Sequence, residues 1–136
     1  MDVDWNGVVR DHGPAVFGAA WRILGHAADA EDVVQEVFLE AQQLGNSRPV
    51  GQWEALLRRM ATFRALDRLR QRKPAVPLDG LPVADRGHEP EAVAVGRELE
   101  TRLRESLARL PDREAAVFCL RFFEDFSYEQ IARSLG

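Results

Sequence analysis

Two segments of this sequence contain charged side chains of opposite sign that could bind other molecules. Residues 27–45 contain five carboxylates and neither lysine nor arginine, whereas residues 52–73 contain seven basic side chains and two acidic ones. A row of carboxylates suits a partner that carries Arg and Lys, and a guanidinium-rich segment suits a phosphate backbone. The charges therefore predict two partners of opposite sign, while a pair of solvated helix faces would give the same composition.

The residue types that bond-making needs are scarce. Cys119 is the single cysteine, so neither a disulfide framework nor a Cys-based zinc site can be built. His12, His26 and His88 show no ligand spacing, and the sequence has neither a Gly-rich phosphate loop nor a Glu-x-x-His pair. We therefore expect a protein that is not an enzyme and needs no metal and no cofactor. Cys119, set among apolar neighbours, should be a small buried hydrophobe.

Helical periodicity dominates the chain, and no stretch alternates as a half-buried strand would. An all-α fold is therefore expected. A first helix near Val8 should be interrupted by Gly13-Pro14, and a second should run from Ala15 to Leu24 with Trp21 on its core face. No apolar run approaches the roughly 18 residues of a membrane span, and no export leader is visible. We expect a cytoplasmic protein without membrane insertion.

Two longer helices should present the charges. Asp29 can cap a helix over residues 29–44, whose apolar stripe contains Val33 and Val37. The stretch GNSRPVG that follows is turn material. The next helix should span Trp53 to Arg72. Its core candidates are Leu56, Leu57, Met60, Phe63, Leu66 and Leu69.

The composition changes after Lys73. Residues 74–90 contain four prolines, which indicates a linker between two small helical modules, residues 1–73 and residues 91–136. In the second module we expect helices over residues 91–110 and after Asp112.

The chain closes on SYEQIARSLG, which predicts a short helix. Ser127 and Gln130 have the spacing of a capping box, and Gly136 can end the helix.

Three stretches together resemble the small bacterial sigma factors of the extracytoplasmic-function (ECF) group: DAEDVVQEVFLEA, WEALLRRMATFRALDRLRQRK and LARLPDREAAVFCLRFFEDFSYEQIARSLG. The resemblance covers nearly the whole chain. It implies that residues 1–73 are sigma region 2, which binds core RNA polymerase and captures melted promoter DNA. It implies that residues 91–136 belong to the helix-turn-helix of region 4. The implied partners are the clamp helices of the largest polymerase subunit, the flap of the second-largest subunit, promoter DNA and an anti-sigma factor.

The resemblance places polymerase binding on the acidic helix. Asp32, Gln35 and Glu36 match the family's motif residue by residue, and Leu39 stands beside them. An acidic surface repels DNA but suits a partner helix that carries Arg and Lys. An ordinary solvated helix face is the alternative interpretation.

The basic helix and the loop before it are expected to bind DNA. Arginines would follow phosphates, an aromatic side chain would stabilise unstacked bases, and LGNSRPVGQ resembles the family's loop for a flipped base. The expected contacts are Asn46, Ser47, Arg48, Trp53, Arg58, Arg59, Thr62, Arg64 and Arg68. One or two of these arginines should pair with the neighbouring acids instead. Leu56 and Thr62-Phe63 depart from the family pattern, so no promoter consensus is transferred.

The last helix would be the supporting helix of a helix-turn-helix, with the groove-reading helix absent from the sequence. We expect a piece of a longer sigma factor, and a natural protein that lacks the second DNA reader is the alternative. A sigma mimic that binds an anti-sigma factor without reading DNA is a further alternative, against which the basic segment weighs.

Overall fold

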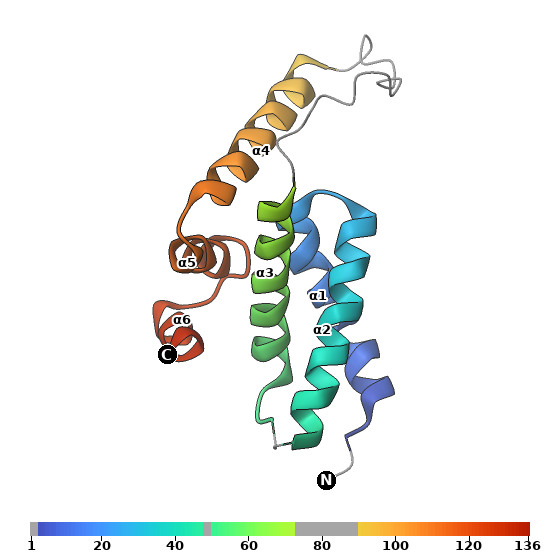
Figure 1. Cartoon of the computed structure of the whole chain (residues 1–136). Coiled ribbons are helices and arrows are strands. Elements are labelled where there is room, and N and C mark those ends of the chain that lie inside the picture. The colour runs from blue at the N-terminus through green and yellow to red at the C-terminus, as the bar shows by residue number, and fades with distance from the viewer. Residues whose placement is uncertain (1–2, 48–49, 73–89) are drawn as a thin grey trace.

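The computed structural model describes residues 3–47, 50–72 and 90–136 (Figure 1). These residues form helices and no strand, which confirms the expected all-α fold. The helices are α1 (Trp5–Leu24), α2 (Ala27–Ser47), α3 (Trp53–Gln71), α4 (Glu91–Arg109), α5 (Asp112–Phe122) and α6 (Tyr128–Leu135). α1, α2 and α3 run side by side, α5 lies beside α3, and α4 extends away from this body (Figure 1).

α1 is one continuous helix, so the predicted interruption at Gly13-Pro14 is wrong. Asp4 caps its first turn by accepting a hydrogen bond from the Gly7 N–H at 3.1 Å. Pro14 lies within the helix on its exposed side, where water can replace the one backbone hydrogen bond that proline removes. The helix ends as expected at Gly25, whose φ of 63° is left-handed.

α2 begins before its predicted start. It starts at Ala27, so Asp29 lies in the first turn and is not the cap. The Asp29 N–H instead donates to Nδ1 of His26 at 3.3 Å. The His26 imidazole therefore accepts a hydrogen bond from one of the backbone N–H groups that have no partner within the first turn of a helix.

α2 also continues past its predicted end, through Gly45, Asn46 and Ser47, which were expected to form a turn. A side chain on Gly45 would come within 3 Å of the rings of Trp5 and Trp53. These two rings meet edge to face with centroids 5.2 Å apart. Gly45 is therefore required for the close approach of two aromatic side chains and not for a turn.

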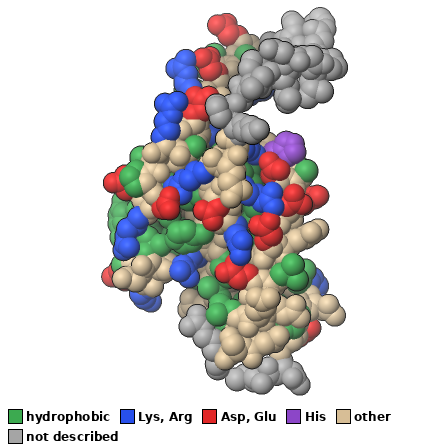
Figure 2. Space-filling view, in the orientation of Figure 1, with side chains coloured by type: hydrophobic (Ala, Val, Ile, Leu, Met, Phe, Trp, Pro, Cys, Tyr) green, Lys and Arg blue, Asp and Glu red, His purple; other side chains and the backbone are tan. Residues whose placement is uncertain are grey.

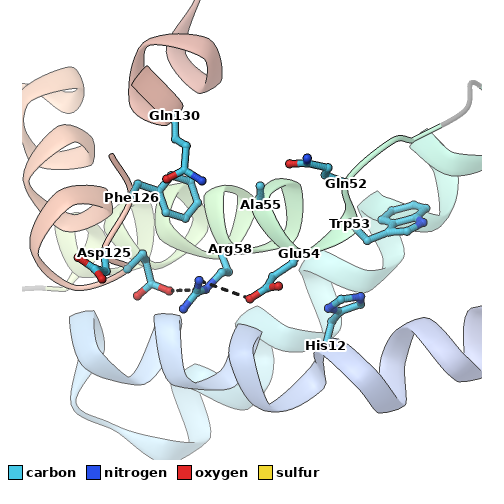
Figure 3. A pocket seen from close by; sticks show the side chains of 10 residues that line it. His12, Gln52, Trp53, Glu54, Ala55, Arg58, Asp125, Phe126 and Gln130 are labelled. Carbon is cyan, nitrogen blue, oxygen red and sulfur yellow. Dashed lines mark ion pairs between the residues drawn. The ribbon is translucent and has the colours of Figure 1, made fainter. Parts of the chain in front are cut away.

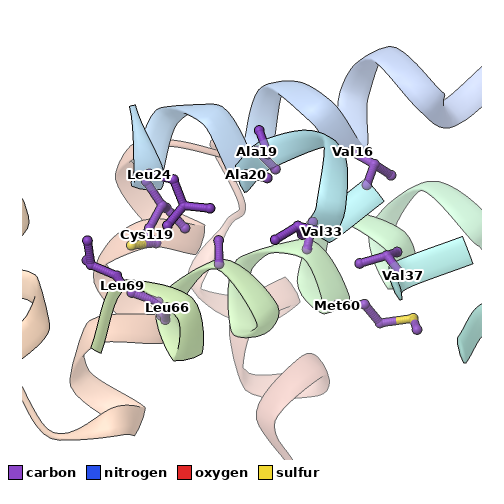
Figure 4. Close-up of a cluster of buried hydrophobic side chains, with 14 of the residues drawn as sticks. Val16, Ala19, Ala20, Leu24, Val33, Val37, Met60, Leu66, Leu69 and Cys119 are labelled. Atoms are coloured by element: carbon purple, nitrogen blue, oxygen red, sulfur yellow. The ribbon is translucent and has the colours of Figure 1, made fainter. Parts of the chain in front are cut away.

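The core of the three-helix body is built largely from small and branched side chains (Figure 4). The fully or almost fully buried ones include Val16, Ala19, Ala20, Ile23, Val33, Val37, Ala41, Leu57, Ala65 and Leu66. Trp21, predicted to lie in the core, is 48% exposed. The buried side of α1 follows Val16, Ala20 and Ile23, and Trp21 falls outside this stripe.

The second half of the chain shares this core. Leu107 of α4 and Ala115, Ala116 and Cys119 of α5 are buried in the same cluster as α1–α3. Cys119 lies next to Leu24 (Figure 4), which confirms the expected buried cysteine, and burial raises the pKa of its thiol to about 12. Residues 91–136 therefore pack against residues 5–71 as part of one body.

The chain end forms as predicted in most details. Ser127 caps α6, and a complete capping box joins it to Gln130. Leu120, Phe126 and Ile131 form a small cluster that holds α6 to α5. One prediction is wrong: Pro111 occupies the cap position of α5, so Asp112 is its first helical residue. The predicted linker, apart from Pro90, lies outside the described residues.

Candidate functional site

α2 and α3 pack so that their charged sides meet. The Arg64 guanidinium donates to Glu40 at 2.8 and 3.1 Å, and Arg68 pairs with Glu36 and also, at 3.7 Å, with Asp32. The hydrogen bonds to Glu40 and Glu36 raise the pKa of Arg64 and Arg68. Two of the expected DNA-binding arginines therefore pair with the neighbouring acids, and acidic and basic side chains are interspersed over this face (Figure 2).

These pairs hold the two helices weakly. The side chains of Arg64 and Glu40 are 43% and 47% exposed, and ion pairs at such sites contribute about 0–1 kcal/mol. Salt screens them further. A polyanion such as DNA can therefore exchange with the carboxylates without disturbing the core.

The four predicted polymerase-binding residues lie together on one surface. Asp32, Gln35 and Leu39 are exposed and Glu36 is partly exposed. Gln35 and Leu39 also line a groove of about 370 Å³ between α1 and α2. The other side chains that line it are Trp5, Val9, Phe38 and Gln42. The surface thus has an acidic edge toward α3 and an apolar and amide edge toward α1, a division that sequence reasoning did not predict.

The predicted DNA-binding residues of α3 divide into different environments. Thr62 is fully buried, and its hydroxyl donates to the Arg58 carbonyl at 2.9 Å, so it cannot serve as a surface contact. Arg59 lies over the Phe63 ring at 5.6 Å. Trp53 is half-buried against Trp5. Arg48 lies outside the described residues.

Arg58 contacts the second half of the chain. Its Nε lies 3.2 Å from Oε1 of Glu124, and its Nη1 lies 3.5 Å from Glu54 (Figure 3). Arg22 of α1 donates to the same Glu124 at 2.7 and 3.1 Å. The Glu124 side chain is 1% exposed. Because Arg22 and Glu124 are 102 positions apart, the sequence gives no signal for this pair.

The same contact closes one side of a cavity of about 510 Å³. His12, Trp53 and Arg58 line it from α1 and α3, and Phe126 and Gln130 line it from the end of the chain (Figure 3). The cavity is therefore a gap at the junction of the two halves and not a pocket within either one.

Two further arginines join the halves by polar contacts. Arg70 of α3 pairs with Asp112 and donates to the Leu110 carbonyl at 3.1 Å. Arg104 of α4 donates to the Ile23 carbonyl at 3.0 Å. Within the described residues no cluster of three or more His, Cys, Asp or Glu could hold a metal ion, and none of the described helices could cross a membrane.

Both halves match known protein families. Residues 8–74 match Sigma-70 region 2, and residues 100–136 match Sigma-70, region 4. The chain is 32% identical over 136 residues to the ECF RNA polymerase sigma factor SigE of Mycolicibacterium smegmatis, covering 97% of this chain and 53% of that protein. It is 31% identical over 134 residues to the ECF RNA polymerase sigma factor SigW of Bacillus subtilis, covering 89% of this chain and 71% of that protein. This chain belongs to the ECF group of the sigma-70 family.

The ECF chain spans about half the length of its mycobacterial relative. Its region 2 match contains most of α1 and all of α2 and α3, and its region 4 match begins within α4. The polymerase-binding and DNA-binding residues predicted from the sequence therefore all fall within region 2, whereas Glu124 falls within region 4.

Proposed function

We propose that this ECF chain acts as a sigma factor, which binds core RNA polymerase and directs promoter recognition and DNA melting at transcription initiation. The match to both sigma regions in one chain carries the proposal. Residues 1–73 act as region 2, residues 74–90 as the linker and residues 91–136 as part of region 4. The activity belongs in the cytoplasm, where the polymerase works.

The α2 surface supports a role in polymerase binding. Asp32 and Glu36 provide negative charge, and Leu39, which is 63% exposed, provides an apolar anchor beside them. Such a combination suits a partner helix with basic and apolar side chains. We infer that this surface binds the clamp helices of the largest polymerase subunit. Region 4 then binds the flap of the second-largest subunit. An anti-sigma factor controls both contacts.

α3 supports a role in DNA binding. Arg64 and Arg68 hold exposed carboxylates that phosphate can replace, and Arg59 and Trp53 add flat side chains on which unstacked bases can lie. Core polymerase that covers the acids of α2 would remove the repulsion between this surface and DNA.

Placing positive charge on α2 tests the polymerase contact. Gln35→Lys/Glu36→Lys should weaken core binding by about 2 kcal/mol or more, the size of an interface hot spot. Both positions lie off the buried stripe, so the thermal midpoint should change little. Binding is measured by titrating labelled chain with core enzyme.

The matched control is Asp67→Lys/Gln71→Lys, which makes the same charge change at exposed positions of α3. It should bind core polymerase as the unmodified chain does. Equal binding by the α2 variant would remove α2 from the interface. Failure of every form to bind core polymerase would contradict the proposed function itself.

A further inference from the structure

α4 carries a row of apolar side chains that remain exposed. The helix extends away from the body of the molecule, and its buried side chain, Leu107, lies near the end of the helix (Figure 1). Val95, Leu99 and Leu103 are 49%, 60% and 37% exposed. Because these three residues are spaced four apart, they lie along one face of the helix, and we call them the apolar row. A row of this kind offers a surface that another molecule can cover.

The charges of α4 are arranged symmetrically about Thr101. Residues 97–105 read RELETRLRE, so each charge on one side of Thr101 is matched by the opposite charge at the same distance on the other side. Leu99 is matched in the same way by Leu103. A helix with this order of residues is complementary to a second copy of itself that runs in the opposite direction.

The charged side chains lie on the two edges of the apolar row. Arg102 donates to Glu98 at 2.8 Å on one edge, and Nη1 of Arg104 lies 3.6 Å from Glu100 on the other. When two copies of a helix pair antiparallel about a two-fold axis, each edge faces the same edge of the second copy. Glu98 then meets Arg102 of the second copy, and its side chain and that of Arg102 are 63% and 69% exposed and can reach across.

A hollow beside the apolar row provides space for a side chain of the second copy. The hollow has a volume of about 200 Å³ and lies where α4 meets α1 and the end of α5. Trp21, Leu103, Leu107 and Phe123 are among the residues that line it. With Leu99 opposite Leu103, Val95 of the second copy lies at the level of Leu107 and therefore beside this hollow. The half-exposed Trp21 ring would be covered by the same contact.

We propose that α4 is a homodimer interface, in which α4 pairs antiparallel with α4 of a second copy about a two-fold axis at the level of Thr101. Leu99 packs against Leu103 of the second copy, and acids and bases are complementary along both edges. The interface consists of one helix and its neighbouring hollow from each copy, so association should be weak and concentration-dependent. The inference goes beyond the proposed function and does not depend on it.

Sedimentation equilibrium of the chain over a range of concentrations tests the interface. The unmodified chain should pass from monomer to dimer as its concentration rises. Leu99→Glu should raise the dimer dissociation constant by about tenfold or more, because the leucine of each copy loses its apolar contact. Leu99 is exposed in the single chain, so the variant should keep the helix content measured by circular dichroism.

Two charge reversals test the antiparallel orientation. Glu98→Arg and Arg102→Glu should each dimerise about fivefold more weakly than the unmodified chain, because like charges then face each other across the two-fold axis. When the two variants are mixed, they should form a heterodimer as readily as the unmodified chain forms its homodimer. Each new charge then faces an opposite charge on the other variant, which requires position 98 of one copy to lie against position 102 of the other.

Glu129→Arg is the matched control for these variants. Glu129 forms the same kind of exposed pair with Arg133, four residues along α6, with side chains 89% and 76% exposed. The control makes the same charge reversal outside the proposed interface and should dimerise as the unmodified chain does. An equal loss of dimer by this control would show an effect of net charge and would overturn the inference.

The outcomes also distinguish other occupants of this face. A chain that stays monomeric up to about 1 mM would overturn the inference. Loss of core-polymerase affinity by Leu99→Glu in such a monomeric chain would assign the apolar row to the polymerase instead. Dimers that neither Leu99→Glu nor the charge reversals weaken would place the interface elsewhere and would equally overturn the inference. The proposed function is tested separately, by the Gln35→Lys/Glu36→Lys variant of α2.

Discussion

The arginines of α3 differ in what they contact, although the sequence presents them as one basic run. Arg64 and Arg68 hold acids of α2, Arg58 holds an acid of region 4, and Arg59 lies on an aromatic ring. Exposed pairs exchange easily with solvent ions, whereas the partner of Arg58 is buried. The same residue type therefore forms exposed, exchangeable ion pairs at some positions and joins the two halves of the chain at another.

This difference predicts how single arginines affect DNA binding. Arg64→Ala and Arg68→Ala should each lower the slope of log affinity against log salt by about 0.7, the contribution of one phosphate contact on a single strand. The slope is measured by fork-junction titrations with core polymerase at several salt concentrations. Arg102→Ala, which removes an exposed pair with Glu98 on α4, is the control and should leave the slope unchanged.

Cys119 predicts a pH dependence of stability. Its thiol pKa is raised from 9.0 to about 12 by burial, with a smaller contribution from the charge of Glu124. Between these values the unfolded chain loses the thiol proton and the folded chain keeps it, so stability from this group falls as pH rises above 9, by up to about 1.4 kcal/mol per pH unit.

Chemical denaturation at a series of pH values checks this, with Cys119→Ala as the control that lacks the thiol. The unmodified chain should lose stability more steeply above pH 9 than the control. The native thiol should also react slowly with iodoacetamide. Parallel pH profiles for the two proteins would contradict the assignment.

At the scale of elements, α6 depends on its cap. It has 8 residues, too few to be stable as an isolated helix. Ser127 Oγ accepts from the Gln130 N–H at 3.1 Å, and the Gln130 side chain accepts from the Ser127 N–H at 2.8 Å. Ser127→Ala should therefore lower the free energy of unfolding by about 1 kcal/mol, measured by urea denaturation.

Ser106→Ala provides the comparison for this prediction. Ser106 is exposed inside α4, where alanine is the better helix former, so this change should not destabilise the chain. If both serine variants behave alike, the capping box contributes nothing to the stability of α6.

The elements also show how far sequence reasoning reaches. The capping box at Ser127, the end of α1 at Gly25 and the buried stripe of α2 follow from local rules, and all three are present. Pro14 and Gly45 predict helix breaks, but Pro14 is accommodated on the exposed side of α1, and Gly45 makes room for the rings of Trp5 and Trp53. Whether a proline or glycine ends a helix depends on the residues that pack around it, and these are determined by the tertiary fold.

The candidate site shows the same limit. The placement of these residues on one surface of α2 could be predicted because Asp32, Gln35 and Leu39 have helical spacing, and Asp32, Gln35 and Glu36 match a family motif. The burial of Thr62 and the contact of Glu124 with Arg22 could not be predicted, since both depend on how α1, α3 and α5 pack. Residues that share one helix face can be predicted from their spacing, whereas contacts between segments distant in the sequence cannot.

At the scale of the whole molecule, the two halves are one packed body despite the proline-rich segment between them. Leu107, Ala115, Ala116 and Cys119 are buried with the core of α1–α3, and each buried aliphatic side chain contributes favourable transfer free energy. The ion pairs of Glu124 and Asp112 add polar contacts to this apolar contact. A chain of this kind need not depend on its covalent connection to stay assembled.

This arrangement predicts that a cut chain remains associated. A specific protease site placed within residues 74–90 should be cleaved to yield two fragments that still co-elute in size-exclusion chromatography. Co-elution should persist at about 1 M salt, which screens the ion pairs but not the apolar contact. Cleaved Ala116→Asp, which places a charge in the shared cluster, should separate, and cleaved Ala94→Asp, at an exposed position of α4, should not. Separate elution of the unmodified fragments at low salt would mean that the linker, and not the contacts between the halves, holds the packed body together.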